Sequence, residues 1–289
     1  MIAAASDETI EQLKVQLKKA HPKSDARFLA HGHKVSFSAI SKTVLQPNLT
    51  DPRTNTSLLD IITLLSALDS VVWDQFGCLS ARIHFVEQGV DPIYSPLDYA
   101  QHLSLQLRML SHHLPRGNWS RNTLHTLFDR YKTLEAHGNV QVCSDYEDEF
   151  LIVFDERKLP VRLFYQQINQ CQGRVIIVKP VASLMEIPKH YLRKLPRSNM
   201  QSLSVAIGHP GESLSQQELD FAHACTSCGI TAIRSVGRGA FPQLAYSWDG
   251  LIPLDISHSR PAGNFSTIEF DEPFDQILDT FQWIKSISS

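Results

Sequence analysis

The chain has 289 residues, of which 43% are hydrophobic and 20% charged, and its formal net charge is -3. This composition predicts a folded globular protein of one large domain or two modest ones, and it excludes a disordered chain. The small negative charge and the absence of a long basic run argue against nucleic acid as the main partner. No apolar stretch approaches the roughly 18 residues of a membrane span, and the amino end has no signal-peptide pattern.

The first third of the chain alternates helix and strand signals. A capping sequence at residues 6–9 precedes apolar residues at helical spacing, and this pattern stops at His21-Pro22. Residues 27–40 predict a short strand, a His-Gly-His turn and an alternating second strand. Residues 47–56 are rich in Pro, Asn, Asp and Thr and predict a loop, whereas 58–68 are almost entirely apolar and predict a buried helix.

The rest of the chain continues this alternation, which predicts an α/β fold with a largely parallel sheet. Residue Gly229 is expected to end the helix before it. The tail 270–287 predicts an amphipathic helix that either packs on its own core or helps an oligomer to form. Strand-like runs are expected at 81–87, 150–154, 162–165, 175–178, 203–207 and 233–236, and helices at 99–114, 119–134 and 216–228.

Cys78 is the most informative residue. It follows the polar pair Asp74-Gln75, is flanked by Gly77 and Ser80, and leads directly into a predicted strand. This setting is typical of a thiol held at the mouth of a cleft for attack on a carbonyl, which requires ionisation by a helix N-terminus or a nearby base. The alternative is an inert packed cysteine. The five cysteines (78, 143, 171, 225 and 228) are an odd number, which favours reduced thiols and a cytoplasmic location.

Four segments, in the same order along nearly the whole chain, resemble the Lux-type fatty acyl-CoA reductases, a branch of the aldehyde dehydrogenase superfamily. The resemblance implies an aldehyde dehydrogenase-like α/β fold. Residues 51–289 would form a catalytic domain with a mostly parallel sheet, and residues 1–50 the end of a Rossmann-type nucleotide-binding domain. The matching segments are Ala5-Ser6-Asp7-Glu8-Thr9-Ile10, Gly32-His33-Lys34-Val35-Ser36-Phe37, Trp73-Asp74-Gln75-Phe76-Gly77-Cys78-Leu79-Ser80, and the region from Gly229 to Leu254 that contains Trp248-Asp249-Gly250.

The resemblance also implies a chemistry. Cys78 would attack the thioester of an acyl-CoA or an acyl-carrier protein, with His33 as the base, and NADPH would reduce the acyl-enzyme to a fatty aldehyde. Ser6 and Gly32 are the expected cofactor-binding residues. NADH in place of NADPH stays open, as does the choice between coenzyme A and a carrier protein. No metal is expected.

The nucleotide-binding half that precedes the cysteine region in the superfamily is expected to be largely missing, so weak NADPH binding by this chain alone is predicted. The expected partners are a homo-oligomer or a separate nucleotide-domain chain. Two alternatives remain: an acyltransferase or thioesterase-like protein without hydride chemistry, and an inactive remnant that acts as a binding or oligomerisation module.

Other motifs favour structural roles. The pair in Cys225-Thr226-Ser227-Cys228 could be redox-active or half a zinc site, but without a second pair it is expected to pack in a helix. Gly237-Arg238-Gly239 predicts a turn at the edge of the active-site cleft, with Arg238 available to a carboxylate or phosphate. Residues 145–149, with four acidic side chains, predict a solvated loop, and residues 248–250 an anchoring turn.

Overall fold

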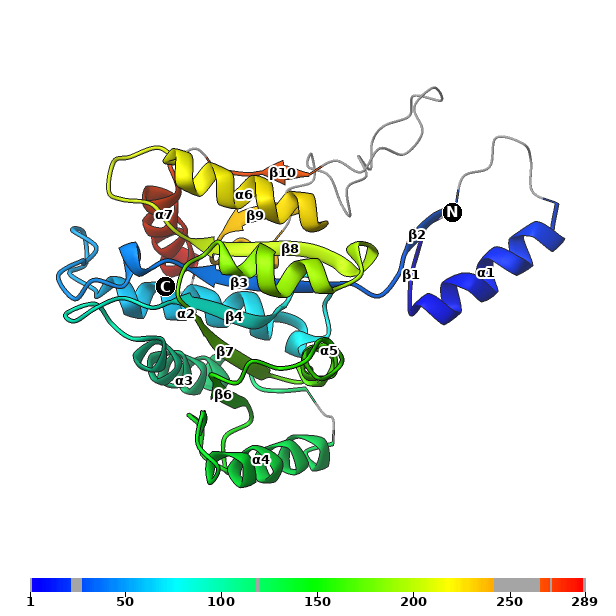
Figure 1. Cartoon of the computed structure of the whole chain (residues 1–289), viewed down its shortest axis with the longest axis horizontal. Coiled ribbons are helices and arrows are strands. Elements are labelled where there is room, and N and C mark those ends of the chain that lie inside the picture. The colour runs from blue at the N-terminus through cyan, green and yellow to red at the C-terminus, as the bar shows by residue number, and fades with distance from the viewer. Residues whose placement is uncertain (1, 22–27, 118–119, 242–265, 271, 288–289) are drawn as a thin grey trace.

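The computed structural model describes residues 2–21, 28–117, 120–241, 266–270 and 272–287. Its main feature is an eight-stranded sheet in the order β10-β9-β8-β3-β4-β7-β6-β5, in which every neighbouring pair is parallel except β5 and β6. The predicted α/β class with a mostly parallel sheet is therefore confirmed (Figure 1). The strands are β3 (Val35–Ile40), β4 (Ala81–Glu87), β5 (Val140–Val142), β6 (Leu151–Asp155), β7 (Val175–Val181), β8 (Met200–Ala206), β9 (Ala232–Ser235) and β10 (Thr267–Ile268).

Helices cover both faces of this sheet, as expected where parallel strands are buried on both sides. Helices α2 (Leu58–Val71), α3 (Pro96–His113) and α7 (Pro273–Ile287) bury their apolar side chains in one core. Helices α4 (Asn122–Glu135), α5 (Val161–Gln170) and α6 (Gln216–Cys228) pack on the other. Short helical turns η3 (Ile187–Tyr191), η4 (Leu192–Lys194) and η5 (Arg197–Asn199) connect β7 to β8, while η1 (Lys42–Val44) follows β3 and η2 (Val72–Gln75) follows α2.

Local sequence explains where several of these elements begin and end. Ser215 and Glu218 form a capping box at the start of α6, and Gly229 ends that helix with φ of 116°, a left-handed conformation that glycine adopts without steric cost. The final helix packs on its own core through Phe274, Ile277 and neighbouring apolar residues, in agreement with the simpler of its two expectations.

The strand-like assignment of residues 162–165 is wrong, because these residues lie in helix α5. Phe164 and Ile168 are buried four residues apart, so the apolar residues follow helical spacing and face the core together. A run of four residues is too short to separate the two periodicities. Strand β5 was not predicted from the sequence, because three residues are too few to show an alternation of apolar and polar side chains.

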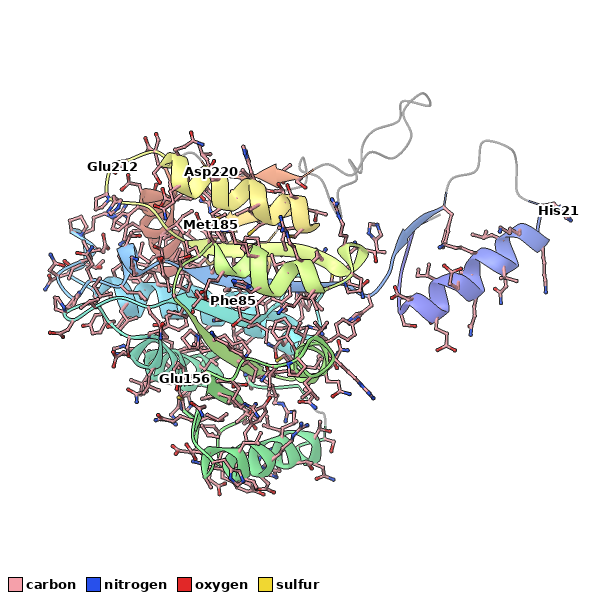
Figure 2. The ribbon with its side chains drawn as sticks, viewed as in Figure 1. His21, Phe85, Glu156, Met185, Glu212 and Asp220 are labelled. Atoms are coloured by element: carbon pink, nitrogen blue, oxygen red, sulfur yellow. The ribbon has the colours of Figure 1, made fainter. Side chains whose placement is uncertain are left out.

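A smaller unit precedes the large sheet. Parallel strands β1 (Ile2–Ala4) and β2 (Leu29–His31) flank helix α1 (Asp7–Lys19) and form a separate two-stranded sheet. Figure 1 shows this unit beside the main body, and Figure 2 places Phe85 inside that body and His21 beyond the far end of α1. Strand β3 pairs with both β4 and β8, although a boundary at residue 50 assigned it to the smaller part. The two-stranded sheet ends with β2, and the large sheet begins with β3.

No helix within the described residues combines the length and the apolar character that crossing a bilayer requires.

Candidate active site

Cys78 and His33 lie at the same edge of the large sheet. Ser36 of β3 pairs with Ala81 of the parallel strand β4. His33 precedes Ser36 by three residues, and Cys78 precedes Ala81 by three. Both residues therefore lie just before the amino ends of adjacent central strands, in loops that approach the same edge of the sheet. The fold thus places the loops of two residues that are far apart in the sequence at one edge of the sheet.

The turn before Cys78 has an unusual backbone. Trp73, Asp74 and Gln75 have φ values of 61°, 50° and 62°, so three consecutive non-glycine residues adopt the left-handed conformation. Each such residue costs on the order of 1–3 kcal/mol and persists only where its surroundings hold it. Three in succession directly before a candidate nucleophile indicate a turn whose shape the rest of the fold enforces.

Side-chain hydrogen bonds hold this turn in place. The Asp74 carboxylate accepts from Arg174 Nε at 2.6 Å and from the Gly117 backbone N–H at 2.8 Å. Arg174 is buried, so its ion pair with Asp74 is shielded from water. Gln75 is also buried: its Oε1 accepts from the Val175 N–H at 2.8 Å, and its Nε2 donates to the Ala81 carbonyl at 3.0 Å. The turn is therefore fastened to strands β4 and β7.

Cys78 itself is held from both sides and stays half-buried. Ser36 Oγ donates to the Cys78 carbonyl at 2.7 Å, and Ser80 Oγ donates to the Val72 carbonyl at 3.1 Å, which closes the turn around the cysteine. All five cysteines lie in the described part of the chain, and none forms a disulfide. The Cys78 loop thus has a fixed backbone and a reduced thiol.

Apolar surface lies beside this thiol. Trp73 is 77% exposed and Phe76 is 44% exposed, although large aromatic side chains are usually well buried. Trp73 also passes close to Gly77, next to the cysteine. Two exposed aromatic side chains therefore lie in the turn that leads to Cys78.

The His33 loop depends on helix α1. The His33 backbone N–H donates to Asp7 Oδ1 at 2.8 Å. A Cβ atom at Gly32 would lie 2.2 Å from the same oxygen, so any other residue there would displace the Asp7 carboxylate from this hydrogen bond. Ser6 is the N-cap of α1, where its Oγ accepts from the Thr9 N–H at 3.3 Å. Ser6 and Gly32 thus have clear structural roles, and their expected role in cofactor binding stays a prediction.

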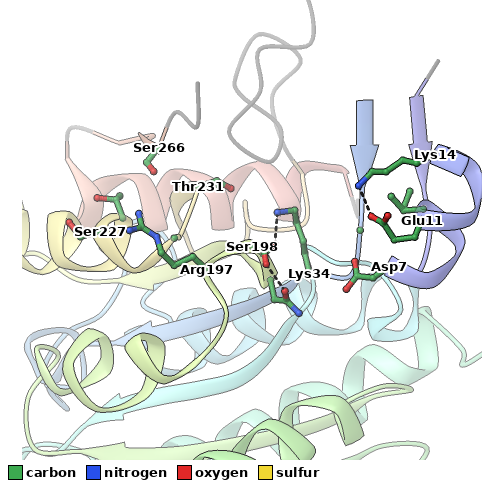
Figure 3. Close-up of a pocket in the computed structure, with 14 residues that line it drawn as sticks. Asp7, Glu11, Lys14, Lys34, Arg197, Ser198, Ser227, Thr231 and Ser266 are labelled. Carbon is green, nitrogen blue, oxygen red and sulfur yellow. Dashed lines mark hydrogen bonds and ion pairs between the residues drawn. The ribbon is translucent and has the colours of Figure 1, made fainter. Parts of the chain in front are cut away.

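A cleft of about 670 Å³ lies between α1 and the main body. Figure 3 shows Asp7, Glu11 and Lys14 of α1 on one side, and Arg197, Ser198 and Ser227 on the other. Gly32 lines it, whereas Cys78 and His33 do not. Because Ser198, Thr231 and Ser266 precede β8, β9 and β10, the cleft opens along the same amino edge of the sheet as the Cys78 loop.

The Gly237-Arg238-Gly239 turn does not belong to this site. It follows β9 and so lies at the carboxyl edge of the sheet, opposite to Cys78. Arg238 Nε donates to Thr280 Oγ1 at 2.9 Å, and the Gly237 N–H donates to the buried carboxylate of Asp69 at 2.8 Å. The expectation of a turn was correct, but its expected place at the active-site cleft was wrong. Residues 248–250 lie outside the described part of the chain.

The Cys225 and Cys228 pair is structural in this fold. Both side chains are buried in helix α6, and burial raises the pKa of both thiols, so they stay protonated and unreactive at neutral pH. Among the described residues, no group of three or more His, Cys, Asp or Glu side chains is placed to hold a metal ion.

Sequence comparison gives the family. Residues 2–257 match the model of the acyl-CoA reductase (LuxC) family, which is nearly the whole chain. The chain belongs to the LuxC acyl-CoA reductase family. No curated protein sequence matches it significantly.

Solved structures that resemble this LuxC family member include aldehyde dehydrogenases and another oxidoreductase. A NAD-dependent aldehyde dehydrogenase from Burkholderia multivorans is 13% identical, with a TM-score of 0.53 over 86% of this chain and 42% of its own. The Delta-pyrroline-5-carboxylate dehydrogenase from Mycobacterium tuberculosis is 10% identical, with a TM-score of 0.52 over 98% and 47%. An oxidoreductase from Marinobacter aquaeolei is 10% identical, with a TM-score of 0.52 over 86% and 46%. The aldehyde dehydrogenase-like fold is confirmed, and the chain spans less than half the length of these proteins.

Proposed function

We propose that this chain carries the thiol half of a fatty acyl thioester reductase, with Cys78 as the nucleophile. The observation that supports this most directly is the strained turn at Trp73, Asp74 and Gln75, which is fastened by buried side chains and ends at a half-buried thiol. Such strain is typical of functional sites. Membership of the LuxC acyl-CoA reductase family supports an acyl thioester as substrate.

The proposed chemistry begins with acyl transfer. The Cys78 thiolate adds to the thioester carbonyl, the carbon–sulfur bond to the carrier breaks, and the carrier leaves as a thiol after taking up a proton. His33, in the loop at the same edge of the sheet, would take the Cys78 proton and return it to the leaving sulfur. The exposed Trp73 and Phe76 would receive the apolar acyl chain.

A nicotinamide cofactor, with NADPH as the expected form, would bind in the cleft between α1 and the main body. Lys34 and Arg197 supply cations for the phosphate end of such a molecule, and Ser198 and Thr231 supply hydroxyl groups. Lys14 is paired with Glu11, and Asp7 also lines the cleft, so the phosphate is expected on the side of Lys34 and Arg197. When bound, the cofactor would supply the hydride that converts the acyl-enzyme to an aldehyde. The chain spans less than half the length of the dehydrogenases that it resembles, so we expect weak NADPH binding by this chain in calorimetry. Tight stoichiometric binding would contradict this expectation.

The test is acylation of Cys78. The purified chain is incubated with short, medium and long acyl-CoA, and the acylated peptide is identified by mass spectrometry. We expect an acyl adduct on Cys78 that disappears in Cys78→Ala and persists in Cys143→Ala, since Cys143 is half-buried at a distant strand.

The same experiment separates the other two classes of function. Release of coenzyme A without NADPH oxidation, even when a nucleotide-binding partner chain is supplied, would indicate acyl transfer or hydrolysis instead of reduction. The absence of any adduct with every acyl-CoA would indicate a binding or oligomerisation module and would overturn the proposal.

A further inference from the structure

Arg82 is a buried cation with few partners. Its side chain is 3% exposed, its Nη1 donates to the Ile168 carbonyl at a long 3.4 Å, and its Nε has no hydrogen-bond partner among the described residues. An arginine that is removed from water without a paired anion is costly, because buried charges normally have close partners. By contrast, the buried Arg174 and Arg234 each pair with a carboxylate at 2.6 Å.

The backbone directs Arg82 to this position. Ser36 pairs with Ala81 and Phe37 pairs with Ile83, so Arg82 is an extra residue in β4, as in a β-bulge. A bulge re-aims the side chain at that point of a strand. The Arg82 side chain consequently reaches the carboxyl end of α5 at Ile168, on the face of the sheet where Ile83 also packs.

Two thiols lie near the guanidinium. Burial lowers the pKa of Arg82, whereas the charges that Cys171, Cys78 and Tyr165 can carry act to raise it. Cys171 is fully buried, and burial raises its pKa to about 12, so it remains a neutral thiol at physiological pH. Cys78 is half-buried, and Ser36 anchors its carbonyl beside Ala81, the residue before Arg82. Of these two thiols, only that of Cys78 is therefore partly open to solvent and to reagents.

We propose that Arg82 is a positioning residue that stabilises the thiolate of Cys78 and thereby prepares it for acylation. Its incomplete hydrogen bonding leaves the guanidinium charge available to the sulfur anion, which would be the counter-ion that the buried arginine otherwise lacks. This inference rests on the proposed nucleophile, but it concerns the ionisation of the thiol and requires neither acyl donor nor cofactor. The competing role for Arg82 is structural, as a cation at the carboxyl end of helix α5.

The test is the pH dependence of Cys78 alkylation by iodoacetamide, followed on the Cys78 peptide by mass spectrometry. In the wild-type chain we expect half-maximal reactivity clearly below the value of about 8.5 for an ordinary thiol. In Arg82→Met the midpoint should rise by about one pH unit or more, and alkylation at neutral pH should slow about tenfold. Arg82→Lys, which keeps the charge, should recover most of the shift.

Arg234→Met is the matched control, because it removes another buried arginine far from the Cys78 loop. It should leave the alkylation profile of Cys78 unchanged. If the alkylation midpoint of Cys78 in the wild type lay at or above the pKa of an ordinary thiol, the wild-type measurement alone would overturn the proposal. An unchanged midpoint in a folded Arg82→Met would overturn it as well and would leave the structural role. If acyl-CoA fails to acylate a Cys78 whose midpoint does depend on Arg82, the proposed substrate is at fault and not this inference.

Discussion

Asp69 is a fully buried carboxyl group that anchors the turn after β9. It accepts from the Gly237 N–H at 2.8 Å and the Ala240 N–H at 3.3 Å. Burial nevertheless raises its pKa to about 6, from an ordinary 3.8. Between these two values the folded state binds more protons than the unfolded state, so this group favours folding below pH 4 and loses that contribution as the pH rises through 6.

We therefore predict that Asp69→Asn changes the pH dependence of stability. The shift in the pKa of Asp69 corresponds to about 3 kcal/mol of folding stability. The wild type should lose this stability between pH 4 and 6, and the variant should not. Urea unfolding at several pH values in this range measures the free energy of unfolding of wild type and variant. The difference between them isolates Asp69, because all other carboxyl groups are common to both proteins and contribute equally. Asp145→Asn, at an exposed carboxylate, is the control and should follow the wild type. If the free energy of unfolding changed with pH in the same way for wild type and Asp69→Asn, the prediction would be contradicted.

At the scale of single residues, the sequence predicts the roles of some residues and not of others. Cys78 could be proposed as a nucleophile because its neighbours form a recognisable segment, and Gly229 could be predicted because a helix end needs a left-handed residue. Asp69 could not, since its backbone partners Gly237 and Ala240 lie more than 160 positions away and only the fold brings them together. The role of Arg82 could not be predicted either, because its position depends on a β-bulge that the periodicity of the sequence does not indicate.

At the scale of elements, the turn between α2 and β4 depends on tertiary contacts. Its left-handed residues oppose local preference, and the Asp74–Arg174 ion pair helps to compensate. We predict that Asp74→Asn destabilises the chain by about 3–5 kcal/mol, because it leaves a buried arginine without its counter-charge. Denaturant unfolding measures this cost, and acylation of Cys78 should slow in the same variant because the turn is no longer held.

The matched control for that variant is Asp148→Asn. Asp148 also pairs with an arginine, but Arg108 is 41% exposed, so the loss should stay below about 1 kcal/mol. If Asp74→Asn and Asp148→Asn lost equal unfolding free energy, the burial of Arg174 would not determine the cost of breaking its ion pair. The strands and helices on either side of this turn were predictable from apolar periodicity, whereas the left-handed turn itself was not, because no glycine marks it.

At the scale of the whole molecule, helix α1 of the small β1-α1-β2 unit is far less buried than the central strands of the main body. Of helix α1, all of whose residues are described, only Ile10 is buried, while β3 and β4 are buried throughout. A two-stranded sheet is marginally stable by itself. The sequence predicted helix α1 from its cap and spacing, but the division between β2 and β3 follows from sheet pairing that local patterns do not contain.

This difference predicts unequal stability within one chain. Amide hydrogens of α1 should exchange at least about tenfold faster than those of β3, β4 and β7, because few buried contacts have to break when the unit opens. Hydrogen–deuterium exchange with peptide-level mass spectrometry measures the ratio, and helix α2, which is buried along most of its length, is the internal reference. Addition of excess NADPH should slow exchange in α1 and leave α2 unchanged if the cofactor binds in the cleft that α1 lines. Protection of α1 equal to that of α2 without ligand would contradict the first expectation, and slowing of both helices alike would contradict the second.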